Sequence, residues 1–158
     1  MTTLNQNQFA QIPVLGQLDL HFNTETVSAI VHVSASASTL VAGQAVKIVD
    51  EAGGVPKVVP CTADSNEVFG FIVFDRMHPS FTGGDSVEIA QAGNVMYLYA
   101  TGAVARGAQV ALAYATAGGV KALAGSGGAD IVGYAYDKAA TAGLIRVKLG
   151  VPSFAKDA

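Results

Sequence analysis

Hydrophobic residues along the chain fall in short runs separated by turn-forming residues. Val, Ile, Tyr and Phe cluster in these runs, and Gly, Asn, Asp and Ser lie between them. This pattern is typical of short strands in an all-β domain. We expect strands at residues 27–33, 45–49, 55–62, 68–74, 86–89, 94–99, 109–113, 120–122, 131–136 and 144–149, and an extended ribbon at 18–22. Any helix is expected to be a single turn within 137–142.

Two stretches of the chain share one pattern. EVFGFIVFD at 67–75 and DIVGYAYD at 130–137 both read acidic residue, apolar pair, Gly, aromatic residue and a closing Asp. Other pairs follow in the same order at an offset of about 60–65 residues: 41–46 with 104–110, 53–55 with 118–120, and 84–89 with 143–149. We interpret this as an internal duplication with pseudo-repeats at about 41–93 and 104–150. The alternative is the general likeness of Gly-rich β sequences.

The duplication predicts how the halves combine. A β-meander of this size cannot bury both faces of its sheet alone, so two related halves should pack into one small barrel or sandwich. We therefore expect an all-β fold, with residues 17–158 forming a single β domain. Residues 1–16 are rich in Gln and Asn and lack strand periodicity, which predicts an extended, flexible N-terminal arm.

Composition narrows the function classes. Hydrophobic residues make up 51% of the chain and charged residues 13%, against about 25% charged residues in typical domains. So little charge indicates a surface partly covered by other subunits. A net charge of −3 gives no electrostatic footprint for nucleic acid, and no apolar run is long enough to span a membrane. The single cysteine, Cys61, is expected to be a small buried residue.

No residue pattern predicts catalysis. The three histidines match no metal-ligand spacing: His21, His32 and His78. Four carboxylates lie at expected turns, where local hydrogen bonding favours them: Asp50, Glu51, Asp75 and Asp85. There is no G-x-S-x-G nucleophile motif or P-loop. We therefore expect no catalytic residues, metal or cofactor, and a protein that is not an enzyme.

Two pairs of tyrosines should each share one face of a strand. They are Tyr97 with Tyr99, and Tyr134 with Tyr136. Such pairs can form platforms for sugars or bases. Because basic residues are not interleaved with them, a place in the core or at a subunit contact is the favoured interpretation.

The second half of the chain resembles a known family. GAVARGAQVALAYATAGGVKAL followed by ADIVGYAYDKAATAGLIRVKLG is similar to the decoration, or cement, proteins of tailed-bacteriophage heads. The matching positions are Gly107 and Val110, then Val132, Gly133 and Ala135, then Ala139, Ala140 and residues 143–149. The first half carries a looser copy, and the likeness covers about residues 40–150.

The resemblance implies a structural virion protein with a tulip-like fold. It would be assembled in the bacterial host cytoplasm, bind the outer capsid surface and stabilise contacts between major capsid protein subunits. The implied partners are the major capsid protein and the chain itself, as a homotrimer or alternatively a homodimer, with no nucleic acid or membrane. Several weak contacts made at once by one oligomer would together give tight binding to the capsid.

The arm is the candidate capsid contact. Its apolar residues stand inside a polar segment and are the expected anchors for strand addition to a capsid sheet: Phe9, Ile12, Pro13, Val14 and Leu15. The alternative function is a carbohydrate-binding or adhesive module on the virion surface, presenting the tyrosines. A tail-tube or baseplate component and a small hydrolase or metal enzyme are weaker alternatives.

Overall fold

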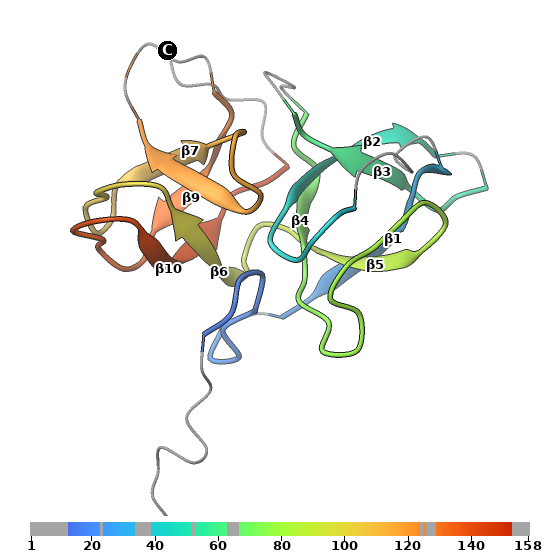
Figure 1. Ribbon diagram of the computed structural model, residues 1–158, viewed down its shortest axis with the longest axis horizontal. Helices are drawn as coiled ribbons and strands as arrows, with labels where there is room; N and C mark the ends of the chain where they lie inside the picture. Colours follow the sequence, from blue (N-terminus) through green and yellow to red (C-terminus); the bar gives the residue numbers. More distant parts are fainter. Residues whose placement is uncertain are drawn as a thin grey trace, which may run out of the picture.

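The computed structural model describes residues 13–22, 24–33, 39–51, 53–62, 67–123, 125 and 129–152. These residues form ten strands and no helix, and the strands make two barrels that lie side by side (Figure 1). The N-terminal barrel contains β1 Thr26–Val31, β2 Ala45–Asp50, β3 Lys57–Pro60, β4 Gly70–Ile72 and β5 Ser86–Ala90. The C-terminal barrel contains β6 Val95–Ala100, β7 Gln109–Leu112, β8 Gly119–Ala122, β9 Ile131–Ala135 and β10 Gly143–Leu149. The all-β class is confirmed, and every expected strand overlaps an observed one.

Both barrels have the same strand order. The N-terminal barrel runs β1-β3-β2-β4-β5 and the C-terminal barrel runs β6-β8-β7-β9-β10, each closing on itself. β1 pairs with β3, and β6 with β8, in parallel; all the other neighbours are antiparallel. We expected two meanders that share one barrel or sandwich. Each half instead crosses over and closes, because closure leaves no unpaired sheet edge.

The strand registers also correspond. Val46 lies opposite Gly70 in the N-terminal barrel, and Val110 lies opposite Gly133 in the C-terminal barrel. On the next pair of strands, Phe71 faces Ala90 and Tyr134 faces Lys148. The register therefore places Ala90 in the same position as Lys148, and this offset is one or two residues shorter than the sequence match between 84–89 and 143–149 suggests.

The glycine shared by the two sequence stretches has a packing role. A Cβ added to Gly70 would collide with the Ile89 side chain and the Ala90 carbonyl, and a Cβ added to Gly133 would collide with the Lys148 carbonyl. In each barrel the neighbouring strand comes too close for any side chain. The recurrence of this motif therefore follows from packing.

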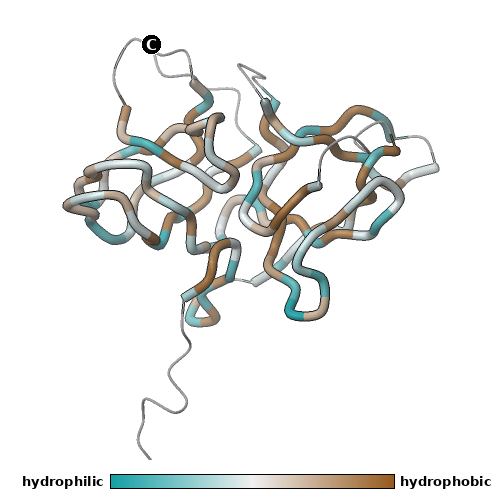
Figure 2. The backbone as a smooth tube through the Cα atoms, viewed as in Figure 1, coloured by the Kyte–Doolittle hydropathy of each residue, from teal (hydrophilic) through white to brown (hydrophobic). Residues whose placement is uncertain are grey.

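Two hydrophobic clusters fill the molecule. One is the core of the N-terminal barrel and includes Val46, Ile72 and Ile89. The other fills the C-terminal barrel and continues onto the outward face of the N-terminal barrel. Apolar segments follow the strands of both barrels (Figure 2). The two barrels therefore share one continuous apolar interface.

One local expectation is wrong. Residues 137–142 form bends and an isolated bridge between Ala139 and Val104, and contain no helical turn. The bridge satisfies the backbone groups that a turn of helix would otherwise use. Cys61 is buried, as expected, and no helix of the described residues is long and apolar enough to cross a membrane.

Candidate functional site

An N-terminal ribbon formed by residues 13–22 lies along the C-terminal barrel. The Gly16 amide donates to the Tyr97 carbonyl at 2.8 Å, and the Asp19 amide donates to the Val95 carbonyl at 2.8 Å. β8 pairs only with Tyr99 and Ala100 of β6. The ribbon therefore pairs with the part of β6 that β8 does not reach, and Leu18 forms a bridge with Met96 there.

Leu15 fixes the ribbon between the two barrels. A Cβ added to Gly43, before β2, would lie 2.7 Å from Leu15 Cγ, and one added to Gly118, in the β7–β8 turn, would lie 2.7 Å from Leu15 Cδ1. The Leu15 side chain thus occupies the space left by two glycines, one from each barrel. Gly16 extends the connection, since its carbonyl accepts a 2.8 Å hydrogen bond from the Phe74 amide.

Arg146 holds the far end of the ribbon. Its Nη1 donates to Asp19 Oδ2 at 3.0 Å, while its Nη2 and Nε donate to the two carboxylate oxygens of Asp137 at 2.8 and 3.0 Å. The guanidinium also stacks 4.6 Å from the centre of the Tyr136 ring, and Phe22 meets the same ring edge-on at 5.3 Å. One arginine therefore joins the ribbon, β10 and the segment after β9.

These ion pairs shift the pKa values of the groups in them. Burial of Asp19 alone would raise the pKa of this carboxyl, but hydrogen bonds from His21 and Arg146 outweigh burial and lower it. The Arg146 hydrogen bond holds the pKa of Asp137 below its usual value. Hydrogen bonds to Asp137 and Asp19 in turn raise the pKa of Arg146. All three groups therefore remain charged at neutral pH.

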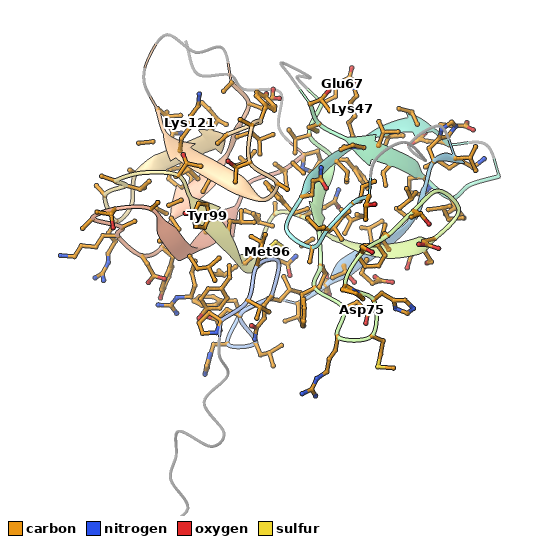
Figure 3. The ribbon with its side chains drawn as sticks, in the orientation of Figure 1. Lys47, Glu67, Asp75, Met96, Tyr99 and Lys121 are labelled. Carbon is orange, nitrogen blue, oxygen red and sulfur yellow. The ribbon has the colours of Figure 1, made fainter. Side chains whose placement is uncertain are left out.

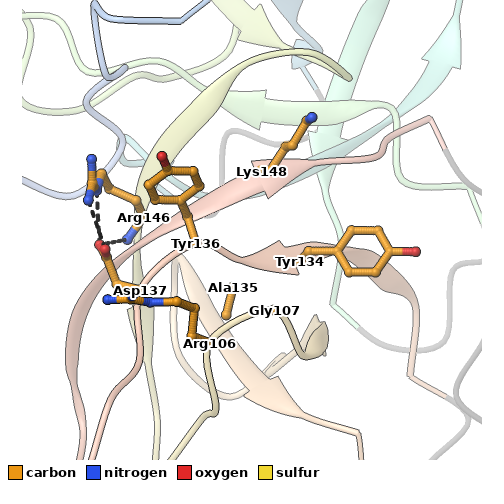
Figure 4. Close-up of a pocket in the computed structure, with 8 residues that line it drawn as sticks. All are labelled: Arg106, Gly107, Tyr134, Ala135, Tyr136, Asp137, Arg146 and Lys148. Atoms are coloured by element: carbon orange, nitrogen blue, oxygen red, sulfur yellow. Dashed lines mark hydrogen bonds and ion pairs between the residues drawn. The ribbon is translucent and has the colours of Figure 1, made fainter.

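An open groove of about 640 Å³ lies beside this arginine (Figure 4). It is lined by Arg106, Gly107, Tyr134, Ala135, Tyr136, Asp137, Arg146 and Lys148. Arg146 is already paired with two carboxylates, so Arg106 and Lys148 supply the groove's remaining positive charge. Tyr134 is 51% exposed. Exposed tyrosine beside arginine is typical of protein interfaces.

Tyr134 of β9 and Tyr136, which directly follows that strand, are therefore not in the core. Both side chains are exposed, and both line the groove. The sequence did not single out Arg146, Asp137 or Asp19 as interacting residues. Its one signal was an arginine on the outward side of an alternating strand, and the alternation does not reveal which acidic residues lie nearby.

The expected arm anchors divide into two groups. Pro13 is exposed and Val14 and Leu15 are half-buried. Phe9 and Ile12 lie outside the described residues. Leu15 packs against the core of the C-terminal barrel, and Pro13 is the exposed member of the described three.

Exposed apolar side chains lie near the ribbon. Leu20 in the ribbon is 70% exposed, and Phe74 and Met77 in the β4–β5 connection are 40% and 79% exposed. The ribbon and the β4–β5 connection, marked by Asp75 in Figure 3, lie on the same side of the molecule. These three residues are defined here as the lower apolar edge. Large apolar side chains exposed on one side favour a binding role for that side.

The carboxylates and histidines of these surfaces form pairs rather than larger clusters. Within the described residues, no group of three or more His, Cys, Asp or Glu is placed to hold a metal ion. His21 and His78 each contact one carboxylate, Asp19 and Asp75.

Comparison with known proteins identifies the family. The family model described as Structural cement protein (E217 gp24/Pam3 gp6) matches residues 12–150. The chain belongs to this family. The resemblance seen in the sequence is confirmed, and it extends over both barrels and into the ribbon. A structural, capsid-associated role follows for this cement protein, and the family implies a non-enzymatic one.

A solved structure shares the fold. The base of head fiber gp8.5 in bacteriophage phi29 aligns with a TM-score of 0.51 and 14% sequence identity, over 84% of this chain and 98% of that chain. At this identity the likeness concerns the fold alone. No curated protein matches the chain in sequence.

Proposed function

We propose that this cement protein binds the outer surface of a phage capsid and stabilises contacts between major capsid protein subunits. The family match over residues 12–150 carries the proposal. Supporting it are the chain's low charge and the exposed lower apolar edge. Assembly in the bacterial host cytoplasm belongs to the same proposal.

The arm and the lower apolar edge are the proposed capsid contacts. The ribbon, residues 13–22, is held by Leu15 and by the ion pair between Arg146 and Asp19. We propose that Phe9, Ile12, Pro13 and Val14 contact the capsid through their side chains, and that the segment before Pro13 adds backbone hydrogen bonds to a capsid sheet edge. Leu15, an anchor expected from sequence, would contribute by holding the ribbon.

Co-sedimentation with undecorated, expanded capsids of the same phage tests the proposal. The full chain is expected to bind saturably at a fixed ratio to the major capsid protein. Deleting residues 2–12, which leaves Leu15 in place, should weaken binding at least about tenfold, a loss of about 1.4 kcal/mol. Deletion of residues 153–158 is the matched control and should bind like the full chain. No binding of the full chain to expanded capsids would refute the function.

The lower apolar edge is tested separately. Leu20→Ser and Met77→Ser change highly exposed side chains, so the fold should be retained. We expect both variants to bind capsids more weakly than the full chain, with the same melting temperature. Val33→Ser is a matched control because Val33 is 68% exposed and lies outside that edge. Equal binding by all three variants would restrict the contact to the arm.

The groove gives some support to a second function, binding of a glycan on the virion surface. Tyr134 is open to solvent within it. Tyr136 is already held by Arg146 and Phe22, so the two rings do not form a free platform. Glycan-array binding by the isolated protein, abolished in Tyr134→Ala, would favour this alternative.

A further inference from the structure

The contact between the barrels uses one face of the N-terminal barrel. Ala45, Phe71 and Ala90 lie side by side on β2, β4 and β5 and point away from that barrel's own core. They belong to the buried cluster that fills the C-terminal barrel. Phe71 and Ala90 are fully buried. The outward face of the N-terminal barrel is therefore a covered interface.

The same face of the C-terminal barrel is open. Strand pairing places Gln109, Tyr134 and Lys148 side by side on β7, β9 and β10, in the positions of Ala45, Phe71 and Ala90. All three residues are exposed, and Tyr134 and Lys148 line the groove of Figure 4. Because one barrel uses this face and the other does not, the contact between barrels is head-to-tail and lacks two-fold symmetry.

The other side of the contact is the β7–β8 turn. A crevice between the barrels is lined by Gln44, Ala45, Cys61 and Thr62 on one side and by residues of 112–119 on the other. Gly118 of this turn also contacts Leu15. The C-terminal barrel thus presents its β7–β8 turn to the outward face of the N-terminal barrel.

The corresponding turn of the N-terminal barrel is also open. Parallel pairing sets Lys57 opposite Ile30 and Gly119 opposite Tyr99, so the β2–β3 turn, of which Glu51 and residues 53–56 are described, corresponds to the β7–β8 turn. A Cβ added to Gly53 or Gly54 would meet nothing within 4 Å, and Val55 is 39% exposed. Each molecule therefore carries both halves of its internal contact a second time, and both of these copies are exposed.

We propose that a second copy of this chain occupies the groove, inserting its β2–β3 turn against Tyr134 and Lys148. The internal contact supplies the geometry. The charges are complementary, because exposed Glu51 of the turn would face Arg106 and Lys148 of the groove. The outward face of the C-terminal barrel is amphipathic, whereas the covered face of the N-terminal barrel is apolar. This difference is expected because a contact between separate molecules leaves its surface exposed to water until they meet. A head-to-tail contact propagates from copy to copy and closes into a ring where the rotation allows.

A charge-exchange series tests the contact in solution, without capsids. Analytical ultracentrifugation of the full chain should show self-association. Lys148→Glu and Glu51→Lys should each weaken the association at least about tenfold, because each places like charges together. The double variant should recover most of the wild-type association. Lys121→Glu and Glu67→Lys, which lie outside both surfaces, are the controls and should associate normally.

Two results would overturn the proposal. One is a monomeric full chain at every concentration reached. The other is an association that the single variants leave unchanged or that the double variant does not restore, which would place self-contact elsewhere. A monomer whose Lys148→Glu variant loses capsid binding would assign the groove to the capsid instead. Because the series needs no capsid, its failure would leave the proposed capsid function untouched.

Discussion

Phe71 and Tyr134 occupy the same position in two barrels of identical strand order, yet Phe71 is completely buried and Tyr134 is 51% exposed. The residues beside them on the neighbouring strands differ in polarity in the same way. Ala45 and Ala90 flank Phe71, whereas Gln109 and Lys148 flank Tyr134. An unpaired lysine is almost never fully buried, so the residue types report which barrel face is covered.

The comparison separates scaffold from surface. The inward residues correspond in the two barrels, and so do the close approaches of the next strand to Gly70 and Gly133. Closure of a five-stranded sheet imposes both features on each barrel. The outward residues differ because one face packs within the chain and the other meets solvent or a partner. Substitutions at equivalent positions should therefore change stability by different amounts on the outward faces, and by similar amounts at Gly70 and Gly133.

The largest divergence is expected at the aromatic pair. Phe71→Ala should lower the free energy of unfolding by about 3–5 kcal/mol, since it removes a fully buried ring between the barrels. Tyr134→Ala should change it by less than about 0.5 kcal/mol. Urea unfolding of both variants measures the difference. Similar losses in the two variants would mean that the barrels are equally covered in solution.

The glycine pair should behave alike. Gly70→Ala and Gly133→Ala each force a methyl group against the backbone of the next strand and should cost about 2–3 kcal/mol. Gly143→Ala, at the start of β10, meets nothing within 4 Å and is the control with little expected change. Thermal unfolding of the three variants measures these costs. If Gly133→Ala retained the wild-type stability while Gly70→Ala lost it, the two glycines would not be equivalent.

Equivalent charged residues should differ in importance. Arg146 in β10 corresponds to Glu88 in β5, since the register pairs them with Tyr97 and Ser28. Arg146→Met leaves buried Asp19 without its cation and should cost about 2 kcal/mol at neutral pH. Glu88→Gln, in an exposed cluster with Thr26 and Ser28, should cost less than about 0.5 kcal/mol. Chemical unfolding of the two variants at pH 7 compares them.

The arginine effect should depend on pH. The pKa values of Asp19 and Asp137 are lowered from 3.8 in the folded protein. Their contribution to stability is therefore present above that pH and is lost as pH falls through the lowered values. The stability gap between wild type and Arg146→Met should narrow below about pH 4. A gap of constant size down to pH 2 would show that Arg146 acts through packing on Tyr136 alone.

The smallest effect is expected at the junction. Leu15→Ala should cost about 1 kcal/mol, because the side chain is half-buried between Gly43 and Gly118. Pro13→Ala is the exposed control. In calorimetry, Leu15→Ala should also broaden or split the unfolding transition as the barrels lose coupling. An unchanged transition in Leu15→Ala would indicate that Phe71 and its neighbours join the barrels without help from the ribbon.

The all-β class and the approximate positions of the ten strands could be predicted from local sequence patterns. Alternation of Val, Ile and aromatic residues with glycine turns is a local property, and it was readable in both halves. The match between Gly70 and Gly133 was visible for the same reason. The family could also be recognised, because its glycine and valine spacing lies within continuous stretches of the second half.

The way in which the strands close, and the barrel face that is covered, depend on contacts between residues far apart in the sequence. The parallel pairing of β1 with β3 crosses over β2, and no local pattern encodes such a crossover. The arginine cluster joins Asp19 and Arg146, which are 127 positions apart in the sequence, so no local pattern predicts it. Phe71 and Tyr134 occupy equivalent positions in their strands. Their different burial depends on the packing of one barrel against the other, which is a property of the whole molecule.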